Sequence, residues 1–302
     1  MPYNFDTILD RKGTQSEKWD RFAPDVLPLW VADMDFPVPE VVIEALQERI
    51  RHPIFGYTNE LSGLREAIQA WLWEKHSFQV ELSDLVFLPG VVVGFNLATR
   101  ILCSPSKGNF SKAVLIQPPV YPPFLKVGEN AGVPLLENPL VPPSSFNPKY
   151  TLDLDQFTYC LNQKPGMFLF CSPHNPVGRV FTKQELEQIA EACLKAGTII
   201  CSDEIHADLT LPGNKHIPIA SLDPEVAKKT ITLMAPSKTF NIPSLEFAFA
   251  VIPDPELRSQ FQTARKGLIG EVNLFGMVAA RAAYQAGETS AEYKWQNQRV
   301  PI

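Results

Sequence analysis

The sequence has no long cluster of basic residues and no long apolar run. Its 27 lysines and arginines are outnumbered by 33 aspartates and glutamates, which gives a net charge of -6 at pH 7. Nucleic-acid-binding proteins usually present a basic surface, so this balance argues against nucleic acid as a partner. No stretch approaches the roughly 18 apolar residues of a membrane span, and the polar start MPYNFDTILDRKGTQSEKWD lacks the apolar core of a signal peptide. We therefore expect a soluble protein with no membrane or nucleic-acid partner.

The sequence is also poor in cysteine. Its five cysteines, at positions 103, 160, 171, 193 and 201, form no CxxC pair and no cluster typical of a metal site. An odd number of scattered cysteines fits the reducing cytoplasm better than a disulfide-forming compartment. The 28 prolines are spread along the chain, so we expect neither a low-complexity linker nor an internal repeat.

What the sequence does contain is an alternation of strand-like and helix-like segments. The clearest helix pattern begins after Thr182, where TKQE makes a capping box, and stops at Gly197. Continuous apolar runs, typical of strands buried on both faces, occur at residues 85–88, 113–116, 167–171, 198–201, 231–234 and 247–252. This order predicts an α/β fold with a mostly parallel, mixed sheet flanked by helices and a ligand at the carboxyl ends of the strands.

Lys238 lies just beyond one of these apolar runs, in MAPSKTFNI. In isolation it could be a solvated loop cation, because lysine is seldom buried without a partner. It could also be a desolvated amine whose lowered pKa makes it a nucleophile toward carbonyl groups.

Two further polar residues follow predicted strands. Asp203, in CSDEIHADL, could be a loop carboxylate or a helix cap, or it could hold a proton on a pyridine-type nitrogen, with His206 near a ring oxygen. Asn175, between Pro173 and Pro176 in CSPHNPVG, could simply form a turn or could donate a hydrogen bond to a phenolate oxygen.

The remaining candidates come earlier in the chain. Gly90, in LPGVVVGFN, stands between a strand and a helix, so the N–H groups near Val91 and Val92 could cradle a phosphate, although this is not a GxGxxG pattern. Tyr121, in QPPVYPPF, could stack on a flat ligand or pack against a neighbouring side chain.

Taken together and in this order, the motifs GVVVGFN, PPVYPPF, SPHNPVG, SDEIHADL and APSKTFN resemble those of the fold-type I pyridoxal-phosphate enzymes of the aminotransferase class I/II family. PLWVADMDFPVPE, GYT and SDEIHADL are similar to the cystathionine β-lyase group called MalY/PatB. The resemblance extends from about residue 3 to about residue 290, and the pair SDEIH and SKTFN is its most specific part.

The resemblance implies a role for each candidate. Lys238 would bind pyridoxal 5'-phosphate covalently and, once displaced by the substrate amine, would move the Cα proton; Asp203 would pair with the pyridine nitrogen. The other cofactor-binding residues would be Asn175 and His206 near the ring oxygen, Tyr121 against the ring, Gly90, Val91, Val92 and Ser237 at the phosphate, and Tyr57 of FGYT at the phosphate of the neighbouring subunit.

The implied activity is β-elimination from cystathionine or cysteine S-conjugates, giving a thiol, pyruvate and ammonia, in a homodimer that shares its active sites. An aminotransferase on the same scaffold is the alternative, and a PLP-binding or regulatory protein with impaired catalysis is a second one. Product analysis separates the first two: pyruvate with ammonia, or a new amino acid formed from an added keto acid.

The resemblance also implies a domain organisation, with two departures. We expect residues 1–45 to belong to a small domain, residues 46–275 to form the large PLP-binding domain, and residues 276–302 to begin a shortened C-terminal part of the small domain. The arginine that clamps the substrate carboxylate in the family has no counterpart by motif, since Arg299 comes too early. Glu246 stands where relatives often place a basic, phosphate-binding residue, so it either points away or weakens cofactor binding.

Overall fold

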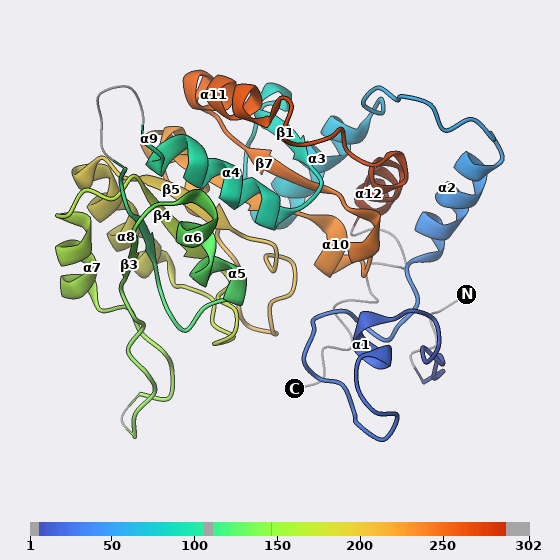
Figure 1. The fold of residues 1–302 in the computed structure, drawn as a ribbon, viewed down its shortest axis with the longest axis horizontal. Coiled ribbons are helices and arrows are strands. Elements are labelled where there is room, and N and C mark those ends of the chain that lie inside the picture. The colour runs from blue at the N-terminus through green and yellow to red at the C-terminus, as the bar shows by residue number, and fades with distance from the viewer. Residues whose placement is uncertain (1–5, 106–110, 146, 288–302) are drawn as a thin grey trace.

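The computed structural model describes residues 6–105, 111–145 and 147–287, and in them seven strands form one mixed sheet (Figure 1). The strand order is β1-β7-β6-β5-β4-β2-β3. The strands are β1 (Leu85–Leu88), β2 (Val114–Ile116), β3 (Leu135–Glu137), β4 (Met167–Cys171), β5 (Ile199–Asp203), β6 (Thr230–Met234) and β7 (Ala248–Val251). Only β7 runs antiparallel to its neighbours, β1 and β6, whereas the other pairs are parallel. The predicted α/β fold with a mostly parallel, mixed sheet is confirmed.

Both faces of the sheet are covered, which explains why the strands are apolar throughout. Side chains alternate along β1, so that Leu85 and Phe87 enter one core cluster while Val86 and Leu88 enter another on the opposite face. All four are buried. The continuous apolar runs of the sequence therefore correspond to strands with no solvent-facing side.

Helices lie on both sides of this sheet (Figure 1). Helices α4, α6 and α11 pack together on one face, and α8 and α9 contact β5 and β6. The longer helices are α2 (Glu40–Ile50), α3 (Leu64–His76), α4 (Val91–Cys103), α7 (Leu154–Leu161), α8 (Lys183–Ala196), α11 (Pro255–Arg265) and α12 (Leu274–Ala286). The short ones are α1 (Glu17–Asp20), α5 (Pro122–Leu125), α6 (Val127–Ala131), α9 (Pro224–Lys228) and α10 (Pro236–Thr239), with single 3₁₀ turns at Leu82–Asp84, Ile219–Ser221 and Pro243–Leu245.

Helix α8 has the ends that the sequence predicts. The Thr182 hydroxyl accepts from the Glu185 N–H, and the Glu185 carboxylate accepts from the Thr182 N–H at 2.9 Å, so the capping box is formed. Gly197 ends the helix with a left-handed φ of 70°, a conformation that glycine adopts at little cost.

Helices from the first quarter of the chain and from its described C-terminal end pack together. Helix α12 packs against α2 and α3, and α1 with its flanking segments lies below α10 in Figure 1. The proposed domain boundaries at residues 45 and 275 stay predictions, and residues 288–302, including Arg299, lie outside the described residues. Within the described ranges, every helix falls short of the combined length and apolarity that a membrane crossing needs.

Candidate active site

A cavity of about 950 Å³ opens beside the carboxyl ends of the central strands. The parallel register pairs Cys171 with Asp203 and Asp203 with Leu233, so β4, β5 and β6 end at the same level. The predicted residues that line this cavity are Gly90, Val91, Val92, Tyr121, Asn175, Asp203, His206, Ser237 and Lys238. Residues spread over about half of the chain are thereby brought to one site, as the parallel sheet predicts.

Lys238 reaches the cavity from α10, the short helix that follows β6. The next two residues, Thr239 and Phe240, are buried and fix this helix to the core. Burial lowers the pKa of the Lys238 amine, and the negative charges of Asp33 and Asp203 oppose that effect. Its Nζ donates a hydrogen bond to the Ala32 carbonyl at 2.9 Å. The side chain is thus a partly desolvated amine, and its role as the cofactor-binding lysine stays a prediction.

Asp203 is the last residue of β5, whereas the sequence placed it just after the strand. Its side chain accepts a hydrogen bond from the Ile205 N–H at 3.2 Å. Burial raises the pKa of this carboxyl to about 7, although that hydrogen bond and the charge of Lys238 favour the ionised form. A buried carboxyl with so little compensation will ionise readily only when a cation is placed against it.

His206, Tyr121 and Asn175 lie around these two groups. Burial, followed by the charge of Lys238, lowers the pKa of His206 to about 4, so its imidazole is neutral at neutral pH. Burial and the charge of Asp203 raise the pKa of Tyr121, so its phenol keeps its proton. The Asn175 backbone N–H donates to the Cys171 Sγ at 3.4 Å, which ties this residue to the end of β4.

The N-terminus of α4 forms another part of the wall. Gly90 is its N-cap residue, in an extended conformation with no side chain capping the helix. A Cβ atom at Gly90 would meet no other atom within 4 Å, so open space adjoins the first N–H groups of the helix. This end of the helix can attract an anion such as a phosphate.

Two further residues were discussed as neighbours of a phosphate, Glu246 in the same subunit and Tyr57 in the neighbouring one. Glu246 lines the cavity and is exposed to solvent, in a left-handed conformation with φ of 52°. Tyr57 does not line this cavity and is fully exposed. Its predicted contact with a neighbouring subunit stays a prediction.

One part of the wall was missed by the sequence interpretation. Residues 29–32, which we call the N-terminal wall together with residues 33–36, line part of the cavity. They belong to the PLWVADMDFPVPE motif, which carried the family resemblance but received no role. Nothing in the local sequence indicates that the Ala32 carbonyl meets a lysine 206 positions later.

A second cavity of about 650 Å³ adjoins the first. The two share Ala32, Asn175, Pro176 and His206. The walls of the second cavity include the apolar residues Pro143, Tyr150, Val177, Val180, Leu209 and Leu211. Among the described residues, no group of histidine, cysteine and acidic side chains is arranged to hold a metal ion.

Comparison with known proteins shows which family the chain belongs to. The model of the family "Aminotransferase class I and II" matches residues 24–300. Cystathionine beta-lyase PatB of Bacillus subtilis is 40% identical, over 94% of this chain and 73% of the relative. The structure of cystalysin from Treponema denticola, which contains pyridoxal 5'-phosphate, superposes with a TM-score of 0.89 at 33% identity, covering 98% of this chain and 74% of that one. A PLP-bound C-S lyase from Staphylococcus hominis superposes with a TM-score of 0.85 at 33% identity, covering 95% and 72%. The chain belongs to the aminotransferase class I and II family.

Proposed function

We propose that this chain is a pyridoxal-phosphate-dependent carbon–sulfur β-lyase. The observation that carries the proposal is that a partly desolvated amine, Lys238, and a buried carboxyl, Asp203, line one large cavity. The relatives named above are a cystathionine β-lyase and a C–S lyase, which supports the reaction type.

The residues of the cavity fit the cofactor. Its phosphate would suit the open N-terminus of α4 at Gly90, Val91 and Val92, and Ser237 lines the same cavity. A protonated ring nitrogen would supply the cation that the buried Asp203 carboxyl otherwise lacks.

The remaining ring contacts follow from the same placement. Tyr121 offers an aromatic face to the ring. Asn175 and His206 are the polar side chains available to the ring oxygen. Because His206 is neutral at neutral pH, it can donate one hydrogen bond without adding charge.

When bound, the cofactor supplies an electron-accepting ring that stabilises negative charge on the substrate's Cα. Proton transfer and charge stabilisation are left to the chain's own residues. Lys238, whose amine has a lowered pKa, is the base available to take the Cα proton. Asp203 would stabilise positive charge on the ring nitrogen.

The reaction balances without a further reactant other than water. The Cα–H bond breaks as Lys238 takes the proton, the Cβ–S bond breaks, and the sulfur leaves with its electron pair as a thiolate. Hydrolysis of the remaining three-carbon unit gives pyruvate and ammonia. The second cavity, which is largely apolar and joins the first at Ala32 and His206, can hold the group attached to sulfur. We therefore propose β-thio amino acids with a sizeable sulfur substituent as the substrate class.

An aminotransferase activity is the second candidate, because the matching family is described by that activity. The deciding experiment incubates the PLP-loaded protein with cystathionine, with and without an added keto acid. A β-lyase releases thiol and pyruvate in equal amounts without the keto acid. Formation of a new amino acid only when the keto acid is present would instead establish the aminotransferase. Lys238→Ala serves as the inactive control in both assays.

We also propose a cytoplasmic homodimer. All five cysteines are free and buried, as a reducing compartment permits. An exposed, partly aromatic segment includes Ile54, Phe55 and Tyr57. Such apolar surface favours contact with a second subunit. Analytical ultracentrifugation tests the dimer.

A further inference from the structure

The N-terminal wall, residues 29–36, contributes both a surface and a hydrogen-bond acceptor to the candidate site. The Ala32 carbonyl accepts from the Lys238 Nζ at 2.9 Å. A carbonyl that holds one N–H of a free amine fixes where the rest of that amine points. The position of Ala32 therefore decides where Lys238 presents its lone pair whenever it is not bound covalently.

Asn241, three residues after Lys238, fastens this wall to the loop that carries the lysine. Its Oδ1 accepts from the Met34 N–H at 2.9 Å. Its Nδ2 donates to the Met34 carbonyl and to the Phe36 carbonyl, each at 3.0 Å. One side chain thus makes three hydrogen bonds to a backbone segment about 205 positions away.

The backbone of Asn241 is itself fixed relative to Lys238. The Phe240 N–H donates to the Pro236 carbonyl at 2.8 Å, and the Ile242 N–H donates to the Ser237 carbonyl at 3.0 Å. Between them Asn241 has a left-handed φ of 56°, which asparagine adopts more readily than most other residues with a side chain. The clamp and the lysine therefore belong to one short, tightly bonded loop.

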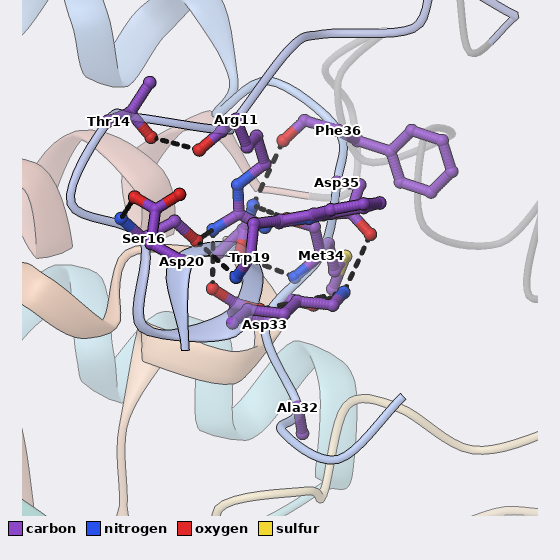
Figure 2. A network of polar contacts seen from close by, with 12 residues as sticks. Arg11, Thr14, Ser16, Trp19, Asp20, Ala32, Asp33, Met34, Asp35 and Phe36 are labelled. Atoms are coloured by element: carbon purple, nitrogen blue, oxygen red, sulfur yellow. Dashed lines mark hydrogen bonds and ion pairs between the residues drawn. The ribbon is translucent and has the colours of Figure 1, made fainter. Parts of the chain in front are cut away.

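Charged residues of α1 and of the segment before it also hold the wall (Figure 2). Arg11 binds Asp33 at 2.7 Å and Asp35 at 2.6 Å. Lys18 binds Asp35 at 2.7 Å and donates to the Asp33 carbonyl at 2.9 Å, and the Trp19 Nε1 donates to Asp35 at 2.7 Å. Two cations balance two anions, so this network holds residues 33–35 to the segment that precedes them, whereas Asn241 holds the same wall to the lysine loop.

We propose that Asn241 is a positioning residue: by clamping Met34 and Phe36 to the lysine loop, it holds the Ala32 carbonyl in place to orient the free Lys238 amine. This inference deepens the proposed function and rests on it for the role of Lys238 as the proton-transferring group. The three hydrogen bonds of the clamp all come from one side chain, so a single substitution can remove them together.

The first test uses protein without cofactor. Asn241→Gly keeps the left-handed backbone accessible but removes all three hydrogen bonds, and Asn241→Asp keeps the shape but turns two donors into acceptors. Ser244→Ala, at an exposed position of the same region, is the matched control. Amide exchange at Met34 should accelerate at least tenfold in Asn241→Gly and should stay at the wild-type rate in the control.

The second test reads Lys238 itself, by competitive acetylation followed by peptide mass spectrometry across pH. If the wall loosens, the amine loses the Ala32 acceptor and the nearby Asp33 charge, which favour the ammonium form, but it also becomes more exposed, which relieves the burial that lowers its pKa. The midpoint of labelling should therefore move away from the wild-type value in Asn241→Gly, and Asn241→Asp, which adds a negative charge near the amine, should have a higher midpoint than Asn241→Gly. The rate at which added PLP is captured at alkaline pH, where the amine is unprotonated, should fall about tenfold because its orientation is lost.

Faster exchange at Met34 with an unchanged labelling midpoint and capture rate would overturn the proposal, because Asn241 would then be merely structural. Unchanged exchange at Met34 would also overturn it. A wild-type protein that captures no PLP would instead contradict the proposed function, while the exchange and acetylation results would still decide whether the clamp positions Lys238.

Discussion

Replacing Asp203 with asparagine should stabilise the protein when no cofactor is bound. The carboxyl is 4% exposed, and burial raises its pKa from an ordinary value of 3.8 to about 7. The folded protein therefore binds more protons than the unfolded chain between these two values, and its stability falls as pH rises through that window. At about 1.4 kcal/mol for each pH unit, the penalty reaches roughly 4 kcal/mol above pH 7. The uncharged amide of the Asp203→Asn variant would escape this penalty.

Urea unfolding of the cofactor-free wild type and of Asp203→Asn tests whether the substitution raises the free energy of unfolding. The variant should be more stable by up to about 4 kcal/mol near pH 8 and nearly equal to wild type near pH 4, where little of the penalty has developed. The reverse order is expected with PLP, because the variant cannot pair with a protonated ring nitrogen. Its proton abstraction should fall about a hundredfold if the charge supplies about 3 kcal/mol. A stability difference that does not change with pH, or a variant less stable than wild type near pH 8, would show that burial of the Asp203 carboxylate does not destabilise the protein.

Three further changes have predictable effects. Glu246→Gln removes a negative charge from the cavity wall and should tighten PLP binding severalfold while leaving binding of pyridoxal, which lacks the phosphate, unchanged in fluorescence titrations. Tyr57→Phe should weaken PLP binding about tenfold if its hydroxyl contributes one hydrogen bond to a phosphate; equal affinities would remove Tyr57 from the site. Asp208→Ala should cost roughly 3–5 kcal/mol in urea unfolding, because it leaves buried His76 without its carboxylate at 2.7 Å; a loss below about 1 kcal/mol would contradict this.

Much of the fold follows from local sequence. Continuous apolar runs predict both ends of β1 and β4 correctly, because these strands are covered on both faces and consist of apolar residues throughout. The three-residue strand β3, Leu135–Glu137, was missed because it lies at the sheet edge and is only partly buried. The antiparallel direction of β7 could not be predicted either, since apolar character gives no strand direction.

The candidate site could also be predicted only in part from the sequence. Residues after parallel strands converge because the strand ends share one edge, so the sequence could place Asp203 and Lys238 near one ligand, whereas their separate roles were implied by the family resemblance. The Ala32 acceptor and the Asn241 clamp could not, because backbone carbonyls carry no sequence signal and the contacts join positions more than 200 residues apart. The pKa of Asp203 likewise depends on burial by many distant residues.

The most direct measurement of the central claim is the location of the cofactor on the chain. The protein is incubated with PLP, reduced with borohydride, digested and mapped by mass spectrometry. We expect one modified peptide, carrying the reduced cofactor on Lys238, and none in Lys238→Ala. Modification of another lysine at full stoichiometry, or an unchanged adduct in Lys238→Ala, would contradict it.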